Sequence, residues 1–167
     1  FVGKMTFFKV MNGEVRRDMT LKNARGGEEK LNKIYTVCGK KQTEVNSLRC
    51  GDIGVTAKLN DTNTNDTLSA SGKIRYAHVI SPVPYMAKGI VPIAKGDEDK
   101  ISQGIAKLLE EDLTLRFENN AETRQMLIYG LGDMHLDVTV ARLKARYGIS
   151  VALEKQRIAY REAIKKK

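Results

Sequence analysis

The feature that most constrains the fold is a change in the spacing of apolar residues about halfway along the chain. Before it, "DIGVTAKL" (52–59) places an apolar side chain at every second position, as a half-buried β-strand does. After it, the apolar residues of 101–109 recur with the spacing of an amphipathic helix. The polar, turn-rich stretch "TNTNDTLSASGK" (62–73) lies between the two patterns. The sequence therefore predicts an α+β protein of two small domains.

Residues 1–70 contain short β-forming runs separated by turn signals. "GKMTFFKVMNG" (3–13) ends at Asn-Gly, and the glycine-bearing "ARGGEE" (24–29) separates the runs "MTLKN" and "KLNKIYTVCG". No helical periodicity of any length occurs in this half. We therefore expect an antiparallel β-barrel or sandwich over residues 1–70, followed by a linker at 71–75.

Residues 76–154 alternate between strand and helix patterns. Two helical stripes, in 101–109 and 136–147, are surrounded by four apolar strand candidates, "YMAKGIVPI", "TLRFE", "QMLIY" and "ISVAL". The resulting order is β-α-β-β-α-β. This order predicts a ferredoxin-like domain.

The motif "GLGDMHLDV" (130–138) joins the third of these strands to the second helix. We expect Gly130 and Gly132 to allow a sharp turn, through a positive φ or a close backbone approach. Asp133 is expected to be the N-cap of the helix and to accept hydrogen bonds from its first free amides. The motif is thus interpreted as a structural turn and cap.

Other interpretations of this motif are less well supported. A dinucleotide-binding loop needs a third glycine, and Asp133, Met134 and His135 follow instead. A metal site is disfavoured because His135 and Asp137 diverge on a helix and no second cluster of ligands exists. No catalytic partner for His135 is evident, so we expect it to pack or hydrogen-bond at the helix start.

Composition limits the class of protein further. The formal net charge of +9 favours an acidic partner, of which nucleic acid is the commonest. Cys38 and Cys50 are too few for a disulfide framework and are expected to be free thiols. No signal peptide pattern and no long apolar run occur, which predicts a cytoplasmic protein without a membrane segment.

Several segments occur in the order and spacing of one known family, and on them the chain resembles bacterial elongation factor G. These segments are "FVGKMTFFKVMNG", "GDIGV", "NDTL", "SPVPYMAKGIVPI", "KISQGIAKLLEEDLTLRF", "QMLIYGLGDMHLDV" and "RIAYREAI". The resemblance implies that residues 1–70 are most of the family's second domain, a barrel incomplete at its N-terminus. Residues 76–154 would be its third domain, and 155–167 the start of its fourth.

The resemblance also implies a function. The chain would be the non-catalytic middle part of a ribosome-dependent GTPase that drives translocation, relaying the nucleotide state and contacting ribosomal RNA and proteins. No GxxxxGK[ST] motif occurs in the chain, so we expect no cofactor here and no enzymatic activity. The resemblance assigns GTP and magnesium to an N-terminal GTPase domain of the whole protein, which would be a monomer.

Four residues match family positions at the GTPase-domain interface or the fusidic acid pocket: Pro84, Thr114, His135 and Arg142. Each also has a plain structural interpretation, such as a strand-edge proline, a strand threonine or a solvated arginine. On the resemblance, His135→Ala is expected to change the melting temperature of this chain little, while it impairs ribosome-dependent GTP turnover or alters fusidic acid sensitivity in the whole protein.

The chain also departs from the family pattern. Glu is usual where Asp133 stands, Pro where Leu113 stands, and Gly at or near Asp18 and Asn65. The loop "GGEEKL" (26–31) lacks the usual basic residues. These departures suggest a diverged member, and a ribosomal-protection-type relative is one alternative.

Two alternatives come from other classes of protein. The basic segment "ARLKARY" (141–147) and the basic tail favour a free-standing RNA-binding module, but the aromatic signature of an RNA-binding ferredoxin-like sheet is missing. A small-molecule enzyme is disfavoured because no acid–base or nucleophile constellation can be assembled.

Overall fold

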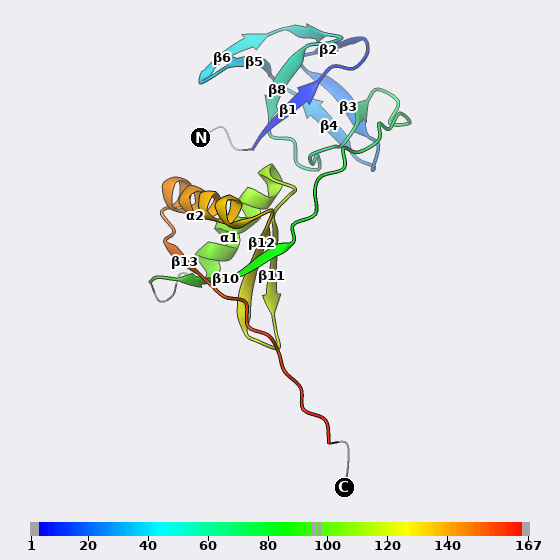
Figure 1. Ribbon diagram of the computed structural model, residues 1–167. Coiled ribbons are helices and arrows are strands. Elements are labelled where there is room, and N and C mark those ends of the chain that lie inside the picture. Colours follow the sequence, from blue (N-terminus) through cyan, green and yellow to red (C-terminus); the bar gives the residue numbers. More distant parts are fainter. Residues whose placement is uncertain (1–3, 95, 97, 165–167) are drawn as a thin grey trace. The chain divides into compact units, whose positions relative to one another are not determined.

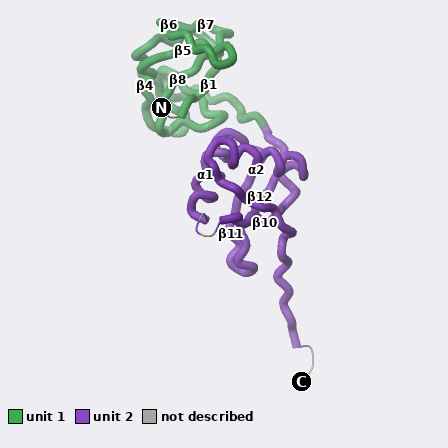
Figure 2. Tube along the Cα trace, turned by 90° about the vertical axis from the view of Figure 1, so that its left-hand side faces the viewer, with its two compact units in different colours: residues 1–79 green, residues 80–167 purple. Residues whose placement is uncertain are grey.

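The computed structural model describes residues 4–94, 96 and 98–164, and the chain divides into two compact units (Figure 2). The first unit spans Phe1–Val79 and the second Ile80–Lys167. The boundary falls within residues 70–85, which carry no helix or strand, a few residues after the linker predicted at 71–75. Each unit has its own buried core.

The described part of the first unit consists of short antiparallel strands. In chain order they are β1 (Met5–Lys9), β2 (Glu14–Arg16), β3 (Met19–Asn23), β4 (Glu28–Leu31), β5 (Ile34–Cys38), β6 (Lys41–Val45), β7 (Ser47–Arg49), β8 (Ile53–Ala57) and β9 (Leu68–Ser69). They pair in the orders β1-β8-β5-β6, β4-β3-β9 and β2-β7. Figure 1 labels the strands from β1 to β6 and β8. The predicted antiparallel β domain is confirmed, although pairing among the described residues does not close into one continuous sheet.

Aliphatic side chains from several strands and loops form the core of the first unit. Its buried members are Val10, Leu21, Leu31, Ile34, Leu48 and Leu59. The alternation predicted along 52–59 is only partly reflected in burial, because Ile53 is 62% exposed at the start of β8. Thr56 is fully buried on the opposite side of the same strand, and its hydroxyl donates to the carbonyl oxygen of Lys33 at 2.9 Å.

Two carboxylates hold the loop that follows β8. Glu29, on β4, is buried and accepts hydrogen bonds from the Asp61 amide at 2.8 Å and the Thr62 hydroxyl at 2.9 Å. Asp66 accepts from the Asn63 amide at 2.8 Å and lies 2.7 Å from a guanidinium nitrogen of Arg25. The loop is therefore tied to the β3–β4 hairpin, although it has no regular structure of its own.

The unusual residues at two turns have a conformational explanation. Asp18 and Asn65 both adopt a positive φ, of 58° and 72°. This left-handed region favours glycine, and Asn and Asp tolerate it better than other residues. The two positions are those at or near which the family resemblance implies glycine, the residue that adopts this region most readily.

The second unit is a four-stranded antiparallel sheet with two helices (Figure 1). Its elements are β10 (Met86–Pro92), α1 (Glu98–Glu111), β11 (Arg116–Asn120), β12 (Gln125–Gly130), α2 (Asp133–Tyr147) and β13 (Val151–Glu154). The sheet order is β11-β12-β10-β13, which is the order of a ferredoxin-like domain and confirms that prediction. In the described residues, neither helix is long and apolar enough to cross a membrane.

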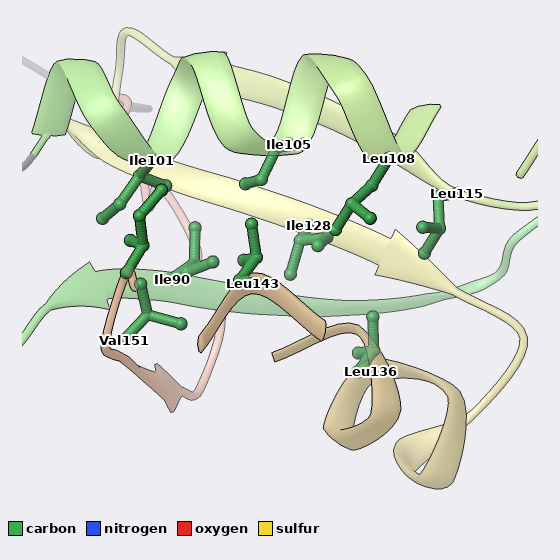
Figure 3. Close-up of a cluster of buried hydrophobic side chains, with 10 residues drawn as sticks. Ile90, Ile101, Ile105, Leu108, Leu115, Ile128, Leu136, Leu143 and Val151 are labelled. Atoms are coloured by element: carbon green, nitrogen blue, oxygen red, sulfur yellow. The ribbon is translucent and has the colours of Figure 1, made fainter. Parts of the chain in front are cut away.

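Both helices bury one stripe against the sheet (Figure 3). Ile101, Ile105 and Leu108 of α1 are at most 2% exposed, as the predicted stripe requires. From α2, Leu136 and Leu143 are fully buried. Each such aliphatic side chain contributes about 1.5–3 kcal/mol when removed from water, so this core provides a rigid frame for the loops at the edge of the sheet.

Candidate functional site

Several elements of the second unit begin or end at the same end of its sheet, where β10 and β11 start and β12 stops. β10 begins with Met86 opposite Gly130, the last residue of β12. β11 begins with Arg116 opposite Tyr129. The loop that follows Gly130 leads into α2. Pro84 precedes β10 and Thr114 precedes β11, so both lie at this end of the sheet. The start of α2, which carries His135, lies at the same end.

A hydrogen-bond network joins the end of α1 to the start of α2. The Asp112 carboxylate accepts from the Thr114 hydroxyl at 2.5 Å and from the Thr114 amide at 2.9 Å. Its other oxygen lies 3.1 Å from Nε2 of His135. Two of the four residues expected at the interface, Thr114 and His135, are thus brought together through Asp112.

Both ring nitrogens of His135 have partners. Nδ1 accepts a hydrogen bond from the Leu131 amide at 3.1 Å, so the neutral ring carries its proton on Nε2 and donates it to Asp112. The side chain is only 20% exposed. An imidazole engaged on both sides has no free nitrogen to act as a general base. The geometry matches the expected hydrogen-bonding role at the helix start.

Asp112 is held in its charged form. Burial raises the pKa of its carboxyl, but the hydrogen bonds from the Thr114 hydroxyl, the Thr114 amide and the His135 ring outweigh that effect and lower the pKa below its usual value. Asp112 is not among the residues expected at a site from the sequence. The signal was an aspartate at a helix end two residues before a threonine, a common side-chain-to-backbone turn.

The cap predicted at Asp133 is wrong. The N-cap position is Gly132, no side chain caps the helix, and Asp133 is already the first helical residue. The helix begins one residue earlier than expected, so the cap position falls on a glycine, which has no side chain to accept from the first free amides. Asp133 is instead exposed and forms an ion pair with Lys88 of β10 at 2.5 Å.

The two glycines of the motif differ. A Cβ on Gly130 would lie 2.8 Å from a methyl carbon of buried Leu136 and 3.1 Å from Nδ1 of His135, so this glycine allows a close approach. Gly132 has an extended backbone with a φ of 171°, and nothing lies within 4 Å of the place of its Cβ. Gly132 therefore has neither the left-handed φ nor the close approach that was expected of it as a turn glycine.

The remaining expected site residues are placed less tightly. Pro84 is half-buried in the irregular segment before β10. Arg142 is exposed on α2, seven residues after His135 and therefore about 10 Å farther along the helix axis. Within the described part of the chain, no hydrogen bond or ion pair connects Arg142 to the Asp112–His135 network.

Three exposed apolar residues are close to members of that network in the sequence. Leu113 is 45% exposed, Met134 is 76% exposed and Val138 is 41% exposed. Leu113 lies between Asp112 and Thr114 in the sequence, and Met134 and Val138 are one and three residues from His135. We call Leu113, Met134 and Val138 the apolar rim.

Comparisons with known families show to which family the chain belongs. The model described as elongation factor G domain 2 matches residues 1–71, and the model described as elongation factor G, domain III, matches residues 81–155. The chain belongs to the elongation factor G family. It carries the family's domains II and III, which correspond to the two compact units.

A solved structure supports the same assignment for this elongation factor G family chain. A protein from Thermus thermophilus is similar over 95% of this chain, with a TM-score of 0.80 and 25% sequence identity. This chain spans 24% of the length of that protein. The similarity therefore concerns about a quarter of a larger molecule.

Proposed function

We propose that this chain is the middle part of a translational GTPase that acts in ribosomal translocation. In this proposal the second unit contacts the GTPase domain of the same protein and relays its nucleotide state to the parts that contact the ribosome. The membership of the elongation factor G family supports the proposal at the level of protein synthesis. The whole protein would act as a cytoplasmic monomer on ribosomal RNA and proteins.

The observation that carries the proposal is the half-buried Asp112–His135 network together with the apolar rim, whose exposed residues are close to its members in the sequence. Exposed apolar side chains beside a hydrogen-bonded polar network can be covered by another protein surface, and in this proposal the GTPase domain covers them. Thr114 and His135 are the two expected interface residues that the network joins. Pro84 at the same end of the sheet and Arg142 on the same helix are proposed to extend this interface.

GTP and magnesium are proposed to bind outside this chain. The printed sequence has no GxxxxGK[ST] motif. Among the described residues, no group of three or more His, Cys, Asp or Glu side chains is placed to hold a metal ion. Both observations support this proposal, and no catalytic step is assigned to this chain.

The geometry of the sheet disfavours a free-standing RNA-binding module. Phe117 of β11 packs against the core, not on the open face. Tyr129 is covered by the guanidinium of Arg116, 4.8 Å from the ring centroid, and its hydroxyl donates to Glu118 at 2.6 Å. A ring that is covered and next to a carboxylate is a poor stacking platform for a base. A ribosomal-protection-type relative stays the alternative within the family.

The proposal is tested in the translation factor that carries these domains, by placing a charge on the apolar rim. Met134→Glu should lower ribosome-dependent GTP turnover by roughly tenfold or more, because it puts a carboxylate into a covered apolar surface. Ile93→Glu is the matched control, since Ile93 is 68% exposed just after the opposite end of β10. Equal turnover in the two variants, with both folded, would contradict the proposed interface.

A further inference from the structure

The side chain of Gln125 connects strand β12 to the end of strand β13 and to the residues that follow it. It is the first residue of β12 and is 3% exposed. Its Nε2 donates to Oε1 of Glu154 at 2.7 Å and to the carbonyl oxygen of Lys155 at 3.0 Å, and its Oε1 accepts from the Arg157 amide at 2.9 Å. One buried side chain therefore holds the end of β13 and the three residues that follow it.

The side chain reaches these partners by crossing the strand between them. β10 lies between β12 and β13, and its Gly89 pairs with Leu127 on one side and Glu154 on the other. A Cβ on Gly89 would lie 2.2 Å from Nε2 of Gln125 and 2.8 Å from Cγ of Glu154. The missing side chain on β10 is thus the space through which Gln125 passes.

Two other contacts of the outgoing segment are at the surface. Arg157 pairs with Glu154 at 3.4 Å, and Arg161 pairs with Glu122 in the β11–β12 turn. In both pairs the arginine is more than half exposed. Exposed ion pairs contribute little to stability. The hydrogen bonds of the buried Gln125 side-chain amide are therefore the contacts that can fix residues 155–157. A buried hydrogen-bonded group is costly to release because its partners are then left unpaired.

We infer that Gln125 is a latch that fixes the direction in which the chain leaves the sheet. Residues 155–157 move with the second unit as part of it, not as a flexible tether. The chain beyond them (Figure 1) then starts from a fixed direction at Arg157. The use of this latch to pass motion onward rests on the proposed function, whereas the latch itself does not.

The latch makes a prediction for the unaltered chain. The Arg157 amide should exchange with deuterium roughly tenfold more slowly than the amides of Gln156 and Ile158, for which the described residues offer no hydrogen-bond acceptor. Residue-resolved exchange by NMR measures all three. Equal rates at the three positions would overturn the latch without any substitution having been made.

A substitution then assigns the effect to Gln125. Gln125→Met keeps the length of the side chain and removes its hydrogen bonds. It should abolish the extra protection of the Arg157 amide and speed tryptic cleavage after Lys155 and Arg157 by roughly tenfold, while the core amide of Ile128 stays protected. Glu122→Gln is the control, because it weakens only the exposed pair with Arg161.

Each outcome tests the role of Gln125 independently of the proposed ribosomal function. Unchanged protection at Arg157 in folded Gln125→Met would show that the amide does not hold the segment. Loss of protection of the Arg157 amide in Glu122→Gln would show that the exposed ion pair with Arg161 fixes the segment instead. None of these measurements uses ribosomes, so a failure of the latch and a failure of the GTP-turnover test remain distinguishable.

Discussion

Nε2 of His135 lies 3.1 Å from a carboxylate oxygen of Asp112, although the two residues are 23 positions apart in the sequence. The contact joins the end of the first helix of the ferredoxin-like unit to the start of the second. It makes His135 part of the fold as well as a residue of the proposed interface. The expectation that His135→Ala would leave the chain's stability unchanged must therefore be revised.

We predict that His135→Ala lowers the free energy of unfolding of the second unit by about 1–3 kcal/mol. The substitution leaves the Leu131 amide and the Asp112 carboxylate without their partner. Urea unfolding followed through amides of the second unit measures the change. His78→Ala, at an exposed position, is the matched control and should unfold like the original chain. A His135→Ala chain as stable as that control would rule out a structural role.

The lowered pKa of Asp112 predicts a dependence of stability on pH. The folded state holds this proton more weakly than the unfolded state, so the stabilisation is present above the ordinary pKa of an aspartate. It is lost as the pH falls through the lower, folded-state pKa. Urea unfolding between about pH 7 and about pH 2.5 should show a smaller acid-dependent loss in Asp112→Asn. Amides of the second unit should be used, because the pKa of Asp66 in the first unit is also lowered.

Gly130→Ala and Gly132→Ala should have opposite outcomes. A methyl group at position 130 meets the fully buried Leu136 side chain at 2.8 Å, so we expect a loss of about 1–3 kcal/mol in the free energy of unfolding. At position 132 the backbone is extended and the space is open, and alanine should be tolerated. Thermal melts of the two variants measure the difference. If Gly132→Ala were the more damaging, the turn geometry would be wrong.

Asp133 should behave as an exposed residue. Because no side chain caps α2, Asp133→Ala and Asp133→Asn should be equally stable, whereas a true cap would tolerate asparagine and not alanine. Lys88→Ala removes the other half of the exposed ion pair and should match them in a melting experiment. A clear advantage of asparagine over alanine would restore the capping role.

The local features of the fold could be predicted from the sequence. The stripe containing Ile101, Ile105 and Leu108 identified α1 because burial of one helix face depends only on spacing along the chain. The cap at Asp133 was missed by a single position, because a helix boundary depends on backbone geometry that the residue types alone do not fix.

The contacts within the site could not be predicted in the same way. Asp112 and Gln125 both act on residues more than twenty positions away, and such partners depend on how the strands are paired. The sequence contains signals for each element but none for which side chains meet across the sheet. Thr114 and His135 were singled out by family resemblance, and Asp112, the residue that joins them, was not.

The crossing of Gly89 by the Gln125 side chain makes the histories of these two positions dependent on each other. A side chain at 89 and a glutamine at 125 compete for the same space. Alanine at 89 should be harmful while Gln125 is present and less harmful once position 125 is short, with the close approach to Cγ of Glu154 remaining. Shortening position 125 first also costs the buried hydrogen bonds of Gln125, so either order of exchange passes through a destabilised intermediate. Substitutions at the two sites should therefore appear together among descendants of this sequence.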